Sequence, residues 1–227
     1  MMRLPPVVGI VLCGGQSTRM GQDKNQVIWA GRTFLQNVLS AVEPVCTKLL
    51  LIKSAPEQAL PEFEIRIPVE ILVDELPHSG PAASLHVGLE ALWRSCVLES
   101  RAATVHSAES TETLPLVLVT GNDSPLLQTS LLSYLAHRLQ EHAEADAVVP
   151  CSSTGLPESY PLCATYRLRC RESLSLYLKQ GHRSLKGWLE QLRVDWVATS
   201  ELKVHDPDLR SLLNFNSPAD FQSAPKQ

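Results

Sequence analysis

Hydrophobic and polar residues follow one another along this chain in short blocks that predict strands and helices in turn. Short, mainly apolar runs, typical of strands buried on both faces, occur at residues 7–13, 49–53, 69–74, 116–120 and 147–150. Between these runs, apolar residues recur at helical spacing over residues 34–42, from residue 81 onwards and over residues 131–139. Thr33 is a typical helix N-cap, Gly80-Pro81 opens the second helix, and Pro44 ends the first.

The alternation of strands and helices predicts a mainly parallel sheet covered by helices on both faces. The chain has 227 residues and shows no second hydrophobic core, so we expect a single-domain, Rossmann-like α/β fold, a three-layer sandwich. Ligands of such sheets bind at the carboxyl ends of the strands. Asp74, Gly80 and Asp123 all fall just past expected strand ends, as does the glycine pair Gly14-Gly15.

Two segments break this rhythm. Residues 95–114 are polar and small with no clear period, which favours a surface insertion or flexible loop. The last residues, from about 222, are typical of a frayed tail. We therefore expect one domain over residues 1–222, interrupted by an insertion at about 95–114, and a tail over residues 223–227.

Composition excludes several classes of function. A net charge of −4 and a pI near 6.0 argue against nucleic-acid binding, although local positive charge can still bind a small anion. No apolar stretch is long enough to span a membrane, and the N-terminal segment fits a first strand better than a signal peptide. The six cysteines form no Cys-x-x-Cys pair, so we expect reduced, mostly buried thiols in a cytoplasmic protein.

The segment after the first strand carries the clearest chemistry. Residues 12–24 read Leu-Cys-Gly-Gly-Gln-Ser-Thr-Arg-Met-Gly-Gln-Asp-Lys. Gly14 and Gly15 lack a Cβ, so their amides can approach phosphate oxygens closely. Arg19 and Lys24 add positive charge beside them. The pattern predicts a loop that binds a triphosphate, and its spacing differs from that of a Walker A loop.

Two aspartates follow strands that should end beside this loop. Asp123 comes directly after the most apolar strand, where a carboxylate can hold Mg²⁺ together with phosphate oxygens and water. Asp74 ends another strand and precedes Gly80. The alternative for each aspartate is an ordinary turn or capping residue.

Residues 12–24 resemble the signature Leu-x-Gly-Gly-x-x-x-Arg-Met-Gly-x-Asp-Lys of the molybdenum cofactor guanylyltransferase, or MobA-like, family. Similar family motifs are an aspartate followed by Gly-Pro-Leu-Ala-Gly (Asp74 and residues 80–84), a Pro-Leu strand (160–166), a glycine-led helix start (181–185) and a closing Asn-x-Asn-Thr-Pro motif (214–220). The chain departs from the family at Ser84, which replaces a glycine, and at Lys53, where asparagine is usual. These departures leave recognition of the base open.

The resemblance implies transfer of GMP from GTP to the terminal phosphate of molybdopterin, with Mg²⁺ as cofactor and release of pyrophosphate. It implies catalytic roles for Arg19, Lys24 and Asp123, with Asp123 also holding the metal. It further implies nucleotide contacts by Leu12, Cys13, Gly14, Gly15, Lys24, Asp74, Gly80 and Asp123, and acceptor contacts by Pro161, Asn214 and Asn216. Partners implied are GTP and molybdopterin, with molybdoenzymes or other cofactor-biosynthesis proteins beyond them.

Other functions remain open at this point. A cytidylyltransferase would use CTP on the same cofactor, and other small-molecule nucleotidyltransferases share the pattern. A non-catalytic nucleotide-binding regulatory subunit is a different class, and the presence of both Lys24 and Asp123 argues against it. We expect GTP to be preferred, with guanine's donors paired by backbone carbonyls near Leu12 and in residues 80–84.

Overall fold

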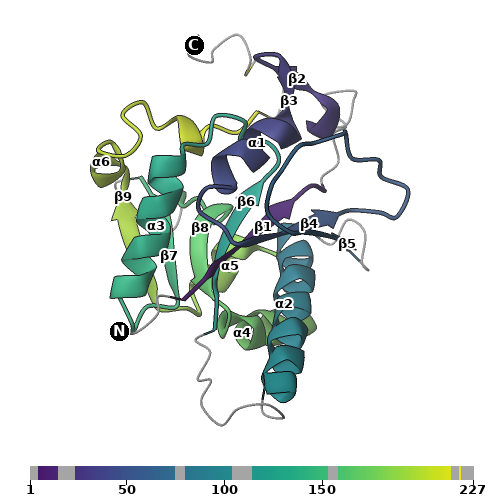
Figure 1. Cartoon of the computed structure of the whole chain (residues 1–227). Helices are drawn as coiled ribbons and strands as arrows, with labels where there is room; N and C mark the ends of the chain where they lie inside the picture. The colour runs from purple at the N-terminus through teal and green to yellow at the C-terminus, as the bar shows by residue number, and fades with distance from the viewer. Residues whose placement is uncertain are drawn as a thin grey trace.

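A computed structural model describes residues 5–14, 24–74, 80–103, 114–152, 158–215 and 220. Within them, seven strands form one sheet in the order β5-β4-β1-β6-β8-β7-β9 (Figure 1). The strands are β1 (Val7–Leu12), β4 (Lys48–Lys53), β5 (Val69–Val73), β6 (Leu116–Gly121), β7 (Ala147–Cys151), β8 (Cys163–Arg167) and β9 (Val194–Ala198). All pair in parallel except β8, which is antiparallel to both of its neighbours. The expected mainly parallel sheet is confirmed.

Helices cover both faces of the sheet (Figure 1). The helices α1 and α3 pack on one face, and α2, α4 and α5 pack on the other. Their bounds are α1 (Phe34–Val42), α2 (Pro81–Ala103), α3 (Thr129–Glu141), α4 (Cys170–Lys179), α5 (Leu185–Leu189) and the short α6 (Thr199–Leu202). A 3-10 turn, η2 (Lys24–Gln26), and a small hairpin of β2 (Ile28–Trp29) and β3 (Arg32–Thr33) precede α1, and η4 (Arg210–Leu212) follows α6.

Successive side chains of each strand supply the two cores in turn. In β1, Val7 and Val11 face α1 and α3, whereas Val8 and Ile10 face α2. Ile10 and Val11 have no exposed surface, and burial of such a side chain contributes roughly 1.5–3 kcal/mol. The apolar runs in the sequence are therefore strands buried on both faces, as expected. The exception is β5, which lies at the sheet edge and leaves Ile71 half exposed.

The ends of α1 agree with its sequence signals. The Thr33 hydroxyl accepts a hydrogen bond from the Gln36 backbone N–H at 3.2 Å, and the helix ends at Val42, two residues before Pro44. The Ser184 hydroxyl likewise accepts the Gly187 N–H at 3.2 Å and begins α5 at the motif proposed to start a helix. All six cysteines are free thiols, and all but Cys96 are buried.

The alternative of a flexible loop at residues 95–114 is wrong for residues 95–103, because α2 continues to Ala103, whereas the surface insertion stays a prediction. These nine residues contain no glycine or proline to stop a helix. Ser95 and Ser100 instead donate their hydroxyls to the carbonyls of Ala91 and Cys96, one turn earlier, at 3.2 and 2.8 Å. Residues 104–113 and the tail after 220 lie outside the described residues.

Asp146 lies just before β7, at the edge where the parallel strands begin. Arg169 Nε donates to its carboxylate at 2.8 Å, and Arg193 donates both its backbone N–H and its Nε at 3.1 Å. Burial alone would raise the pKa of Asp146, but these hydrogen bonds outweigh it and lower the pKa to about 2.

No helix in the described part of the chain is long and apolar enough to cross a membrane.

Candidate active site

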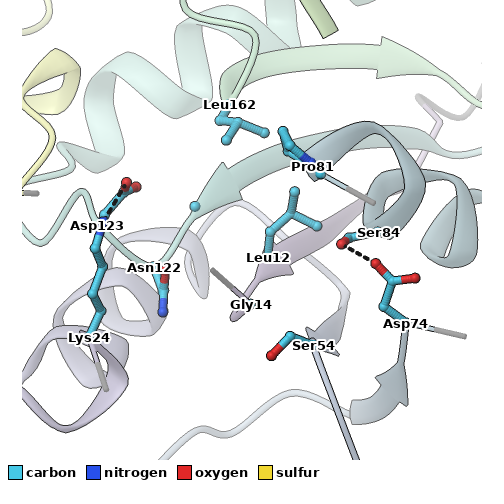
Figure 2. A pocket seen from close by; sticks show the side chains of 12 residues that line it. Leu12, Gly14, Lys24, Ser54, Asp74, Pro81, Ser84, Asn122, Asp123 and Leu162 are labelled. Atoms are coloured by element: carbon cyan, nitrogen blue, oxygen red, sulfur yellow. Dashed lines mark hydrogen bonds and ion pairs between the residues drawn. The ribbon is translucent and has the colours of Figure 1, made fainter. Parts of the chain in front are cut away.

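A cavity of about 450 Å³ opens at the carboxyl ends of β1, β4, β5 and β6 (Figure 2). The start of α2 and the residue before β8 complete its wall. Because β8 is antiparallel, its first residues lie at the same edge as the last residues of its neighbours. The lining residues are Leu12, Gly14, Lys24, Ser54, Asp74, Gly80, Pro81, Ser84, Gly121, Asn122, Asp123 and Leu162.

One end of the cavity carries an ion pair. Lys24 Nζ lies 3.4 Å from Asp123 Oδ2, and the two side chains are only 14% and 22% exposed (Figure 2). Lys24 comes from η2 and Asp123 from the turn after β6, so two distant parts of the chain meet here. A lysine and a carboxylate that both line one cavity can hold phosphate groups, the first directly and the second through a cation.

Gly14 lies where β1 meets the end of β4. A Cβ at Gly14 would stand 2.9 Å from the Ser54 Cβ and 3.3 Å from the Ser54 backbone N and Cα. The glycine is therefore required by the close approach of the two chain segments, with no positive φ involved. Gly14 lines the cavity, and no described residue accepts its backbone N–H.

The opposite end of the cavity carries a second carboxylate (Figure 2). Asp74 is 5% exposed, and Ser84 in the first turn of α2 donates its hydroxyl to Asp74 Oδ2 at 2.7 Å. Gly80, with φ +85°, makes the turn that leads into Pro81 at the start of α2. Leu12 and Pro81 add apolar surface between the two ends of the cavity.

Cys13 does not line the cavity, and its carbonyl accepts hydrogen bonds from three side-chain amides. It accepts Asn25 Nδ2 at 2.9 Å, Gln58 Nε2 at 2.9 Å and Asn122 Nδ2 at 3.3 Å. Its own backbone N–H donates to the Ile52 carbonyl at 2.9 Å. A direct contact of the Cys13 side chain with a nucleotide therefore stays a prediction.

Of the residues expected to bind the acceptor, Asn214 lies next to the turn that carries Asp123, and neither Asn214 nor Pro161 lines the cavity. Ser124 donates its hydroxyl to Asn214 Oδ1 at 2.8 Å, and the next residue, Phe215, donates its N–H to the Asp123 carbonyl at 2.8 Å. The Phe215 ring is buried against Phe34 and Trp29. The Pro161 carbonyl accepts the Tyr166 hydroxyl, and its neighbour Leu162 lines the cavity.

Leu12, Gly14, Lys24, Asp74, Gly80 and Asp123 were expected to contact nucleotide and come together around one cavity. Gly15, Arg19 and Asn216 lie outside the described residues. Ser54 and Asn122 line the cavity but had no expected role. The only signal for them was their position directly after a predicted strand.

The fold and the site together define a nucleotidyltransferase of the α/β class, with the Lys24–Asp123 ion pair and the buried Asp74 at the carboxyl ends of parallel strands. The chain belongs to the family of the MobA-like NTP transferase domain, which it matches over residues 9–196.

Known relatives support this membership. The molybdenum cofactor guanylyltransferase of Desulfosudis oleivorans is 26% identical over 219 residues, covering 96% of this chain and 94% of that protein. A probable molybdenum cofactor guanylyltransferase of Chloroflexus aggregans is 29% identical, covering 94% and 91% of the two chains. The crystal structure of molybdopterin-guanine dinucleotide biosynthesis protein A from Archaeoglobus fulgidus has the same fold, with a TM-score of 0.70 at 22% identity and 95% coverage of both chains.

Proposed function

We propose that this protein transfers GMP from GTP to the terminal phosphate of molybdopterin. An oxygen of the acceptor phosphate forms a bond to the α-phosphorus of GTP. The bond from that phosphorus to the oxygen it shares with the β-phosphate breaks, and its electron pair leaves with pyrophosphate. The observation that carries the proposal is one cavity with the Lys24–Asp123 ion pair at one end and the buried carboxylate of Asp74 at the other.

The phosphate end supports nucleotidyl transfer because its groups match the charge that develops. Lys24 can neutralise charge on the leaving pyrophosphate, and the Gly14 N–H adds a fixed donor. Asp123 fits a magnesium role, since it lines the cavity and its carboxylate oxygens are ligands that Mg²⁺ prefers. Mg²⁺ held there would neutralise phosphate oxygens of the substrate.

The other end supports guanine as the base. The Ser84 hydroxyl has one proton, and that proton is taken by Asp74. Ser84 can therefore only accept a further hydrogen bond, and the carboxylate of Asp74 is also an acceptor. Guanine presents two adjacent donors, N1–H and the 2-amino group, whereas cytosine and adenine each present one amino donor beside an acceptor nitrogen. A pair of acceptors thus favours guanine.

The Ser84 hydroxyl and the Asp74 carboxylate are better placed to accept the donors of guanine than the backbone carbonyls that the sequence suggested. The Leu12 carbonyl already accepts the Asn122 N–H at 3.1 Å, and the Gly80 carbonyl accepts Ala83 N at 3.2 Å in the first turn of α2. Ser84, the departure from the family motif, then contributes to base recognition together with Asp74.

The direct test is a panel of GTP, CTP and ATP with molybdenum cofactor as acceptor, followed by pyrophosphate release. We expect GTP to exceed CTP and ATP in kcat/KM by at least a hundredfold. Faster turnover with CTP would make the protein a cytidylyltransferase. Nucleotide binding without turnover would make it a regulatory subunit.

Variants at the base end sharpen the test. Asp74→Asn replaces one acceptor by an amide donor, so the preference for GTP over CTP should fall by at least tenfold. Asp208→Asn is the matched control, because Asp208 is exposed and makes its ion pair with Arg210 away from the cavity. An unchanged GTP preference in Asp74→Asn would remove Asp74 from base recognition.

A further inference from the structure

We propose that Asn25, Gln58 and Asn122 are positioning residues that aim the Gly14 N–H into the cavity as a fixed donor for phosphate. The inference rests on the proposed function for the place of the phosphates. It assigns a role to three side chains that act through the backbone and do not themselves have to touch the nucleotide. We call these three residues the amide cluster.

The amide cluster converges on a single oxygen. The Cys13 carbonyl accepts N–H groups from Asn25 and Gln58 at 2.9 Å each and from Asn122 at 3.3 Å. A carbonyl oxygen has two lone pairs, so its accepting capacity is filled. Asn25 is fully buried and Asn122 is 5% exposed, so solvent competes little for their two bonds, whereas Gln58 is half-buried.

Fixing the Cys13 carbonyl also fixes the donor on the other side of the same peptide. In a trans peptide the C=O and the following N–H lie in one plane and point in opposite directions. When the amide cluster holds the Cys13 oxygen inside the protein, the Gly14 N–H points away from the cluster. Gly14 lines the cavity, and no acceptor among the described residues takes its N–H.

The amide cluster also joins the chain segments that surround the phosphate end. Gln58 Oε1 accepts the Ser54 N–H at 2.9 Å and its hydroxyl at 3.0 Å, which ties the end of β4 to the end of β1. Asn122 Nδ2 donates to Asn25 Oδ1 at 2.8 Å, which ties the end of β6 to η2. Lys24 immediately precedes Asn25, so the same contacts locate Lys24 opposite Asp123.

The sheet does not need these contacts to pair its strands. Beyond the ladder, Cys13 N already donates to Ile52 and Asn122 N to Leu12, which extends both pairings of β1. Buried amides stabilise a fold only modestly compared with apolar side chains of similar size. A hydrogen-bonded polar cluster at this place therefore serves orientation, because it fixes one geometry for the groups around it.

The test uses magnesium tripolyphosphate, which has no base or acceptor, as the probe for the full-length protein. Gln58→Met keeps the side-chain length but removes the hydrogen bonds to Cys13 and Ser54. Gln36→Met is the matched control: Gln36 exchanges hydrogen bonds with the Glu64 backbone at 2.8 and 3.1 Å on α1, away from the cavity. Affinity is measured by calorimetry and folding by thermal melting. The chemical shift of the Gly14 amide is measured by nuclear magnetic resonance on protein labelled with ¹⁵N-glycine, in which only the 11 glycines of the chain give signals.

We expect tripolyphosphate to move the Gly14 amide proton downfield in the wild type and in Gln36→Met. Gln58→Met should bind about tenfold more weakly, with a smaller shift at Gly14 and a melting temperature close to that of the control. Equal affinity in all three proteins, or equal weakening in both variants, would overturn the inference.

The experiment separates this inference from the proposed function. A wild type that fails to bind tripolyphosphate overturns the inference, since no phosphate then lies at Gly14. A wild type that binds it, is weakened by Gln58→Met and yet does not turn over GTP supports the amide cluster while refuting guanylyl transfer.

Discussion

Gly14→Ala should damage catalysis more than stability, and the structure gives the reason. The new Cβ would lie 2.9 Å from the Ser54 Cβ, about 0.5 Å short of the 3.4 Å at which ordinary contact begins. Ser54 cannot simply rotate away, because its backbone N and Cα are also within 3.3 Å and Gln58 holds it. The end of β1 must therefore move away from β4.

The size of both effects follows from this displacement. Overpacking of this kind costs about 1–3 kcal/mol, and each kcal/mol lowers Tm by about 2–4 °C in a domain of this size. A misplacement of about 1 Å in an active site costs about a hundredfold in rate, so half that distance predicts a loss of at least about tenfold. Pyrophosphate release with GTP and thermal melting measure the two effects separately.

A control and a rescue complete the test. Gly88→Ala on α2 is a matched overpacking control away from the cavity, because its Cβ would stand 2.7 Å from Ile10 Cδ1 and 3.2 Å from Ile10 Cγ2 in the core. Its overpacking cost of about 1–3 kcal/mol is partly offset by the gain of about 1 kcal/mol that alanine has over glycine in a helix interior, so we expect Tm to fall by no more than in Gly14→Ala while turnover stays at the wild-type level. Ser54→Gly removes the atom nearest to the new Cβ and should restore part of the activity of Gly14→Ala. Wild-type turnover in Gly14→Ala, or no rescue, would refute the reasoning.

Three further predictions concern charged groups. Lys24→Ala should lower kcat by about 10²–10³, with a stability change near 1 kcal/mol, as measured by pyrophosphate release and melting; unchanged kcat would exclude Lys24 from the mechanism. Asp123→Asn should raise the Mg²⁺ concentration needed for half-maximal activity, and a Mg²⁺ titration that matches the wild type would leave Asp123 as a turn residue. Asp146→Asn should lower Tm by about 2–4 °C at pH 7. Because the pKa of Asp146 is lowered to about 2, this gap should close as pH falls from about 4 to 2, and a gap independent of pH would contradict the role of the ionised form.

Much of the fold could be predicted because local signals and tertiary packing agree. The runs that became β1, β4 and β6 are apolar throughout, which suits strands buried on both faces. The signals failed where context decides. Residues 95–103 have little periodicity, yet they extend a helix that α4 supports from the side. The reversed direction of β8 leaves no mark in its own sequence.

In the candidate site too, some residues could be predicted from the sequence and others could not. Gly14, Lys24 and Asp123 belong to motifs of residue types that phosphate chemistry requires, so their spacing already pointed to them. Asn25 and Gln58 resemble ordinary solvated residues in the sequence. Their proposed role depends on the pairing of β1 with β4 and β6. This pairing brings the side chains of Asn25, Gln58 and Asn122, which lie 12, 45 and 109 positions from Cys13 in the sequence, to the Cys13 carbonyl oxygen.

Because β8 is antiparallel, the proposed nucleotide contacts and the proposed acceptor contacts come from two different stretches of the sequence. Every cavity residue that meets the nucleotide in the proposed reaction lies between Leu12 and Asp123, whereas Leu162 and Asn214 come from the later part of the chain. Because β8 returns to the same sheet edge, the later stretch reaches the cavity at Leu162 and meets the turn of Asp123 through the Phe215 N–H, a backbone contact that does not depend on the side chain. We expect a chimera that takes residues 158–215 from a relative to inherit that relative's acceptor while keeping its own choice of nucleotide.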